Sequence, residues 1–352
     1  MTVGAVVLAA GDGSRFESDE HKLRALVGDR PVLQHALEAV LGSGYDEVML
    51  VVGDDDYDDV VKAAVEATDA GEPTVVHSPD WRSGQAHSVA VAIEHARSIG
   101  HEAIVIGLGD QPLVGTSTWI ALRDFSDTPI AVASFAGQMR PPTRLASSMW
   151  DQVPTEGDAG ARRLVLDNPD SVTTVASTGN PDDVDTVEAL ERVRQLYDDC
   201  IKVTELLGRE PMGSFEVVVR SDTGAPVVLR NFPVLADGRP MPTLYWLCGE
   251  RESMLIGRLE AAKGVRRAEA DIGLESINAA HERYGTERDN ILEESGVEPL
   301  HRPTGGVGGT RNGVKCLHAH YGYWLAGGDD PVGEWVDSHL GEVDTPHWPS
   351  AT

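Results

Sequence analysis

Short apolar runs alternate with amphipathic stretches along the first half of the chain. The runs are continuously hydrophobic, as in strands that a parallel sheet buries on both faces. They cover residues 5–8, 48–52, 74–76, 103–108, 130–134 and 171–175. The stretches between them have apolar residues at helical spacing and predict helices over residues 32–41, 85–98, 116–125, 159–167 and 187–197. This alternation predicts an α/β domain with a mainly parallel sheet covered on both faces.

The pattern changes after Cys200. Residues 216–220 and 226–230 flank the turn sequence Ser221-Asp222-Thr223-Gly224 and predict a hairpin, and a further apolar run covers 244–248. Helical patterns follow at residues 254–263, 274–284 and 314–326. Strands followed by helices predict a second domain of the α+β class. A length of 352 residues also favours two domains. We therefore expect separable domains at residues 1–197 and 198–352.

A loop of small residues follows the first predicted strand. Its sequence, Ala9-Ala10-Gly11-Asp12-Gly13-Ser14, has two glycines, which allow positive φ and a close approach of a ligand to the backbone. Successive N–H groups of such a loop suit a phosphate, and Arg15 and Lys22 add two cations. A plain turn is the competing interpretation. A dinucleotide loop would need glycine at Phe16. A Walker loop would need a lysine directly after the glycine and then Ser or Thr, whereas Lys22 is too far away and is followed by Leu23.

Later segments place acidic residues at predicted element ends. Asp110, in Asp110-Gln111-Pro112-Leu113, follows a buried strand, where a carboxylate can hold Mg²⁺, since that ion prefers oxygen ligands. A proline turn is the alternative. Asp185 precedes a predicted helix and has Glu188 three residues on, so it is either a second metal contact or a helix cap. Asp183 is the other candidate for that metal contact. Residues 77–88 are also typical of a capped helix entry.

Taken in order, these segments resemble the motifs of the MobA-like nucleotidyltransferases. Leu8-Ala9-Ala10-Gly11, Arg15 and Lys22-Leu23 are similar to the first signature of that family. The later motifs are similar to residues 77–88, 106–113, 157–162 and 180–186, and the sequence at 157–162 is typical of the molybdenum cofactor cytidylyltransferase branch. The resemblance covers residues 3–197. Two departures lie at residues 137–143, which lack the histidine of the family's G-H-P element, and at Val187, where the family has proline.

The resemblance implies a Rossmann-like, GT-A-like three-layer fold and a Mg²⁺-dependent nucleotidyltransferase. The implied reaction transfers CMP from CTP to a phosphorylated acceptor such as molybdopterin. Catalytic roles are implied for Arg15, Lys22 and Asp110. Metal binding is implied for Asp110 with Asp185 or Asp183. Nucleotide contacts are implied for Leu8, Ala9, Ala10, Gly11, Gly13, Ser14, Arg15, Lys22, Ser83, Gly84 and Ser88. Acceptor contacts are implied for Asp158 and Arg162. A molybdoenzyme or chaperone is the implied protein partner.

Two other functions fit the same motifs. The fold could transfer another nucleotide, such as GMP, to molybdopterin or to phospholactate. A different class would be a non-catalytic nucleotide-binding regulator that uses the C-terminal domain for interactions. The presence of Arg15, Lys22 and Asp110 together favours catalysis. A phosphate nucleophile on the acceptor is already ionised, so the lack of an obvious catalytic histidine does not count against transfer.

The second half is similar to DUF501, a family without an activity to carry over. The resemblance lies in Leu207-Gly208-Arg209-Glu210-Pro211, residues 237–247 and Val314-Lys315-Cys316-Leu317-His318. Cys316, His318 and His320 would align for metal binding on a strand but not on a helix, and we expect a helix. His281 is expected to lie on a helix in a surface or packing role, and Gly305–Gly309 is expected to be a loop because it lacks a following Lys.

Composition limits the classes of partner. A net charge of −28 argues against non-specific binding to nucleic acid and to anionic membrane surfaces. No apolar run is long enough for a transmembrane helix, and residues 1–10 lack the basic start of a signal peptide. Three widely spaced cysteines are typical of reduced thiols. We therefore expect a cytoplasmic protein that binds neither nucleic acid nor membranes.

Overall fold

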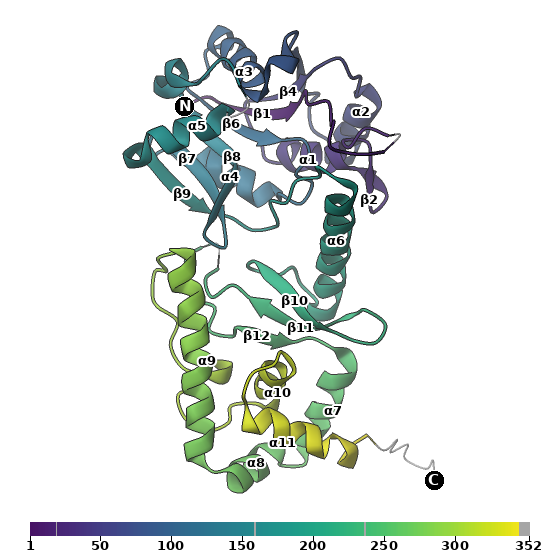
Figure 1. The fold of residues 1–352 in the computed structure, drawn as a ribbon, viewed down its shortest axis with the longest axis vertical. Helices are drawn as coiled ribbons and strands as arrows, with labels where there is room; N and C mark the ends of the chain where they lie inside the picture. Colours follow the sequence, from purple (N-terminus) through teal and green to yellow (C-terminus); the bar gives the residue numbers. More distant parts are fainter. Residues whose placement is uncertain (19, 158–159, 236, 345–352) are drawn as a thin grey trace. The chain divides into compact units, whose positions relative to one another are not determined.

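The chain forms two compact units. The computed structural model describes residues 1–18, 20–157, 160–235 and 237–344 (Figure 1). The units are Met1–Asp198 and Asp199–Thr352, and each has a hydrophobic core of its own. The division falls inside helix α6 (Val187–Leu207), which is longer than the helix predicted over residues 187–197.

The first unit is built on a seven-stranded sheet with the order β5-β4-β1-β6-β8-β7-β9. Its strands are β1 (Val3–Ala9), β4 (Glu47–Val52), β5 (Thr74–His77), β6 (Ala103–Leu108), β7 (Ile130–Phe135), β8 (Gln138–Ala146) and β9 (Val172–Ala176). Every pairing is parallel except those of β8, which runs antiparallel to β6 and β7. The mainly parallel sheet confirms the prediction.

Helices cover both faces of this sheet. One face packs against α1 (Val32–Leu41), α2 (Asp58–Thr68), α4 (Thr116–Asp124) and the start of α6. The other packs against α3 (Gln85–Ile99) and α5 (Gly160–Asp167). Strand β1 shows why the run is continuously apolar: Val7 enters the first core, whereas Val6 and Leu8 enter the second. The three-layer α/β architecture is therefore as expected. A short hairpin of β2 (Leu26–Val27) and β3 (Arg30–Pro31) precedes α1.

Strand β8 was not predicted. From Gln138 on it covers the segment at 137–143, where the family motif has its histidine. Pro141 and Pro142 cannot donate to a sheet ladder, and Arg140 interrupts the apolar pattern, so the sequence lacks a strand signal here. Its register shifts against β7 between Val132 and Ala133, beside these residues. The neighbouring strands β6 and β7 supply the pairing that the local sequence does not favour.

The second unit combines a small sheet with helices, which confirms the α+β prediction. Strands β10 (Phe215–Arg220), β11 (Pro226–Asn231) and β12 (Tyr245–Leu247) pair antiparallel in sequence order. The helices are α7 (Glu250–Ala261), α8 (Gly264–Ile272), α9 (Leu274–Ser295), α10 (Leu317–Leu325) and α11 (Pro331–His339). Val228 packs in the main core among these helices, and Leu229 packs with Val203 from the end of α6.

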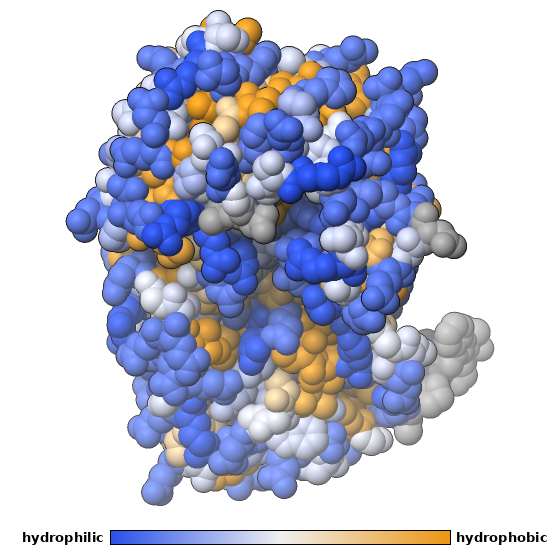
Figure 2. All heavy atoms as spheres, turned by 45° about the horizontal axis from the view of Figure 1, so that its top comes forward, coloured by the Kyte–Doolittle hydropathy of each residue, from blue (hydrophilic) through white to orange (hydrophobic). Residues whose placement is uncertain are grey.

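The surface and the thiols agree with the composition. Hydrophilic side chains cover most of the face shown in Figure 2, as 57 acidic and 29 basic residues predict. Cys200, Cys248 and Cys316 are free thiols. Among the residues that the structure describes, no helix combines the length and hydrophobicity needed to cross a membrane.

We expect residues 1–197 to fold cooperatively without the rest of the chain and to keep nucleotide-dependent activity. The fragment keeps Tyr197, whose ring packs against His35 at 5.2 Å and whose hydroxyl accepts a hydrogen bond from Arg30 Nη2 at 3.1 Å. Thermal unfolding and pyrophosphate release would be measured on the fragment and on a control ending at residue 186. The control lacks the buried Leu190 and Val193 and should be much less stable. An insoluble or inactive 1–197 fragment would contradict the expectation.

Candidate active site

Two neighbouring parallel strands bring the predicted site residues together. Strands β1 and β6 pair in register from Val3↔Ala103 to Leu8↔Leu108, so both end at the same edge of the sheet. The small-residue loop follows β1 and Asp110 follows β6. The backbone N–H of Gly109 donates to Leu8 O at 2.9 Å and joins the two ends. The carboxyl edge of a parallel sheet is where α/β proteins bind ligands.

Lys22 lies at the centre of an ion-pair network at this edge. Its ammonium donates to Asp110 Oδ2 at 2.6 Å and to Asp185 Oδ1 at 2.8 Å. The other oxygen of Asp185 pairs with Arg15 Nη2 at 2.8 Å. Lys22 and Asp110 are largely buried, with side chains 11% and 16% exposed, while the Arg15 side chain is 74% exposed. The fold thus brings together four residues that the sequence placed in three separate motifs.

Burial and the ion pairs together shift the pKa values of Lys22, Asp110 and Asp185. Burial works to lower the pKa of Lys22, but the charges and hydrogen bonds of Asp110 and Asp185 outweigh it, and the net pKa is raised. Burial raises the pKa of Asp110 and, with the nearby charges of Asp183 and Asp185, exceeds the opposing effect of Lys22. Asp185 is less buried, and Lys22 and Arg15 lower its pKa despite its partial burial. Lys22 therefore stays a cation in this site.

Asp110 presents an oxygen that suits a divalent cation. Its Oδ1 atom is buried and has no hydrogen-bond partner among the described residues. A buried acceptor without a partner is costly, and a hard cation would satisfy it. Within the part of the chain that the structure describes, no three His, Cys, Asp or Glu side chains are arranged to hold a metal. A cation at Asp110 and Asp185 or Asp183 would need further oxygens, which a nucleotide's phosphates can supply.

The loop after β1 becomes accessible at Gly11. Leu8, Ala9 and Ala10 are buried, whereas Gly11, Asp12 and Ser14 are exposed. Gly13 has a φ of +60°, which the backbone needs for the tight turn here. Ser14 N–H donates to Asp12 Oδ1 at 3.0 Å, and Phe16 N–H donates to Gly13 O at 2.7 Å. The nucleotide contacts assigned to Gly11, Gly13 and Ser14 stay a prediction.

The second nucleotide segment forms one wall of a hollow. Ser83 ends a short 3₁₀ helix (Trp81–Ser83), and Gly84 caps α3 with a φ of +109°. A hollow of about 490 Å³ is lined by Asp80, Ser83, His87, Thr155, Glu156 and Gly157. His87 Nε2 is buried there and has no partner among the described residues, a feature that the sequence did not signal. Ser88 is buried, and its hydroxyl donates a hydrogen bond to Ser78 Oγ at 3.2 Å. The hydroxyl is therefore bonded within the protein, and its predicted contact with a nucleotide stays a prediction.

Of the two residues predicted to contact the acceptor, only Arg162 is among the described residues. Asp158 lies outside the described residues. Arg162 lies in the first turn of α5 and is exposed. Its guanidinium is thus accessible to an acidic group, and its role stays a prediction.

Histidine and cysteine residues of the second unit have separate partners. Cys316 caps α10, His318 lies 3.3 Å from Glu260 Oε1, and His320 Nδ1 pairs with Asp330 Oδ2 at 2.7 Å. Among the described residues, these side chains form no group that could hold a metal. His281 is buried on α9, in the packing role.

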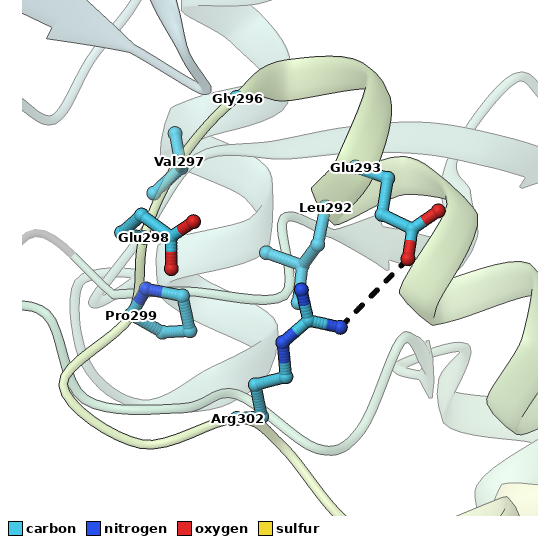
Figure 3. A pocket seen from close by; sticks show the side chains of 7 residues that line it. All are labelled: Leu292, Glu293, Gly296, Val297, Glu298, Pro299 and Arg302. Carbon is cyan, nitrogen blue, oxygen red and sulfur yellow. Dashed lines mark ion pairs between the residues drawn. The ribbon is translucent and has the colours of Figure 1, made fainter.

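A small hollow of about 200 Å³ lies at the end of α9 (Figure 3). Its lining residues are Leu292, Glu293, Gly296, Val297, Glu298, Pro299 and Arg302. Glu293 Oε1 and Arg302 Nη1 are 3.8 Å apart across it, and both side chains are more than 60% exposed. It contains none of the predicted site residues.

A parallel α/β sheet with a small-residue loop, cations and carboxylates at its carboxyl edge is the arrangement expected of a nucleotidyltransferase, and the family comparison identifies the first unit as one. Residues 5–172 match the MobA-like NTP transferase domain family. The chain belongs to that family. Residues 217–338 match a protein family of unknown function, DUF501, so both expected resemblances are confirmed.

The chain is also similar to individual proteins. The chain is 31% identical over 196 residues to the purine catabolism protein PucB of Bacillus subtilis (strain 168), which covers 54% of this chain and 95% of that protein. It is 37% identical over 120 residues to the bifunctional protein GlmU of Agrobacterium fabrum, which covers 34% of this chain and 25% of GlmU. The crystal structure of Rv0371c from Mycobacterium tuberculosis H37Rv superposes with a TM-score of 0.46 at 28% identity, covering 55% of this chain and 98% of that one.

Proposed function

We propose that this protein transfers a nucleoside monophosphate, CMP from CTP, to a phosphorylated small-molecule acceptor of the molybdopterin type. The observation that carries the proposal is Lys22, whose ammonium is 2.6 Å from Asp110 and 2.8 Å from Asp185 beside the small-residue loop. A largely buried cation held by two carboxylates beside a small-residue loop suits phosphoryl chemistry, where charge neutralisation and positioning supply most of the rate.

Each group of site residues has a separate role in the proposed reaction. The N–H groups of Gly11, Asp12 and Gly13 bind phosphate oxygens, and Arg15, which is largely exposed, reaches the triphosphate. Lys22 exchanges part of its carboxylate contact for the α-phosphate and offsets the charge that develops there. Asp110 with Asp185 or Asp183 would hold a divalent cation, Mg²⁺ in this proposal, which supplies Lewis-acid charge neutralisation when bound.

The reaction needs no general base. An oxygen of the acceptor's ionised terminal phosphate forms a bond to the α-phosphorus, and the bond from the α-phosphorus to the bridging oxygen breaks. Pyrophosphate leaves with that electron pair, in line with the attack. The exposed Arg162 on α5 provides a cation for an acidic acceptor.

The kcat/KM for CTP is expected to be higher than those for GTP, ATP and UTP by about tenfold or more. The support is the resemblance of residues 106–113 and 157–162 to the cytidylyltransferase motifs. The test incubates the protein with each nucleotide, Mg²⁺ and molybdopterin, and measures pyrophosphate release. Calorimetry with each nucleotide gives the binding affinities separately.

Each alternative result has a distinct meaning. Faster release from GTP would replace cytidylyl transfer by guanylyl transfer. Tight binding of a nucleotide without release, with molybdopterin and with other phosphorylated acceptors, would indicate a nucleotide-binding regulator. The Asp110→Asn variant serves as the inactive control.

A further inference from the structure

His21 contacts both the small-residue loop at residues 9–14, called the phosphate loop below, and the start of helix α2. Its Nε2 atom is 3.1 Å from Gly11 O, in the loop after β1. Its Nδ1 atom is 3.3 Å from Leu23 N and 3.2 Å from the hydroxyl of Tyr57, the residue that caps α2. The side chain is 17% exposed. A Cβ atom on Gly13 would lie 3.3 Å from Nε2, so the ring also packs against the turn of the loop.

These partners determine the tautomer of the ring. Leu23 N–H can only donate, so Nδ1 must accept and carries no proton. Burial, with the nearby Asp55 charge, raises the pKa of Tyr57, so its hydroxyl keeps its proton and also donates to Nδ1. The ring proton therefore sits on Nε2 and is donated to Gly11 O at 3.1 Å, since Asp55 Oδ2, at 4.0 Å, is too far from Nε2 for a hydrogen bond. Each ring nitrogen is thus assigned to a different element of the fold.

The bond to Gly11 O controls an N–H group of the loop. In a trans peptide the C=O of Gly11 and the N–H of Asp12 point in opposite directions. Holding the carbonyl toward His21 therefore aims the Asp12 N–H away from the ring. His21 also precedes Lys22 directly, and its own carbonyl accepts from Arg24 N at 2.8 Å. One short segment thus positions both the loop and the central ammonium.

We infer that His21 is a positioning residue that pre-orients the backbone donors of the phosphate loop through its Nε2–H bond to Gly11 O. The inference rests on the proposed binding of a nucleoside triphosphate at this loop. Donors that are already aimed lose less freedom when a ligand binds, so the triphosphate is bound more tightly. The role belongs to Nε2, whereas the bonds at Nδ1 fix the ring itself.

Two substitutions separate the two nitrogens. His21→Gln keeps a donor at the position of Nε2 and loses the Nδ1 acceptor, whereas His21→Asn keeps an acceptor near Nδ1 and loses the donor to Gly11 O. Calorimetry on the full chain with inorganic tripolyphosphate and Mg²⁺ measures loop affinity without any reaction. Thermal unfolding of each variant measures the structural cost. His301→Asn, at an exposed histidine of the second unit, is the matched control.

The expected result is a loss of about tenfold or more in tripolyphosphate affinity for His21→Asn and of less than about threefold for His21→Gln. The control should match the wild type. Equal losses in both variants, or no loss in either, would overturn the positioning role, since a merely structural histidine would not distinguish them. If the wild type binds tripolyphosphate but releases no pyrophosphate from any NTP, the proposed transfer fails while the comparison of the two variants still decides the role of His21.

Discussion

Asp110→Asn is expected to lower the kcat for pyrophosphate release about 10³-fold, which corresponds to about 4 kcal/mol of transition-state stabilisation. Asparagine has nearly the same volume but no charge. It therefore weakens both the contact to Lys22 and the cation site at Oδ1, the atom without a hydrogen-bond partner among the described residues. The apparent affinity for Mg²⁺ should fall in parallel. Steady-state kinetics over a range of Mg²⁺ concentrations measures both effects.

The control for this variant is Asp170→Asn, at an exposed carboxylate in a 3₁₀ turn of the same unit. It should stay within about twofold of the wild type, as surface substitutions usually do. Circular dichroism and thermal unfolding establish that Asp110→Asn is folded. A folded variant with nearly normal turnover would remove Asp110 from the metal site. The same assay on Asp183→Asn and Asp185→Asn decides which of them assists it.

Lys22→Ala is expected to lower kcat by about 10²–10³-fold while changing KM much less, since its charge acts mainly on the transition state. It should also destabilise the fold by about 3–5 kcal/mol, because Asp110 is left buried without its cation. An unchanged kcat with a raised KM would assign Lys22 to ground-state binding instead.

The stability cost of Lys22→Ala should depend on pH in a defined direction. Lys22 lowers the pKa of Asp110, so removing it raises that pKa further above the unfolded value. A carboxylate with a raised folded pKa destabilises the protein above its unfolded pKa of about 3.9 and ceases to do so below it. The difference in Tm from the wild type should therefore shrink as the pH falls toward 4.

The double variant Lys22→Ala/Asp110→Asn provides the matching control for stability. It removes both charges, so it should recover part of the stability lost in Lys22→Ala. It should not recover turnover. A double variant as unstable as the sum of the single variants would show that the two residues act independently in folding.

Most elements of the first unit could be predicted from local sequence. Strands β1, β4 and β6 are continuously apolar because both of their faces are buried, and this pattern survives in any tertiary context. Strand β8 could not be predicted from its local sequence, since its prolines disfavour a strand and pairing with β6 and β7 stabilises it. Helix α9 was expected to end at Tyr284, yet it continues through Gly285 to Ser295. Helix α11 was missed although Asp330 and Pro331 form a recognisable start.

The sequence by itself determined which residues are available for chemistry: a glycine loop after a strand, two cations close behind it and carboxylates at later element ends. Only the tertiary structure decided which of them meet. Asp185 is 163 positions from Lys22, and no local pattern specifies that contact. The same holds for the burial of Ser88, for the two-sided contact of His21 and for Asp110 Oδ1, which lacks a partner in the part of the chain that the structure describes. The local sequence pattern indicates which residues of a segment are buried and which are exposed. The distances between segments are set by the packing of the whole sheet and its helices.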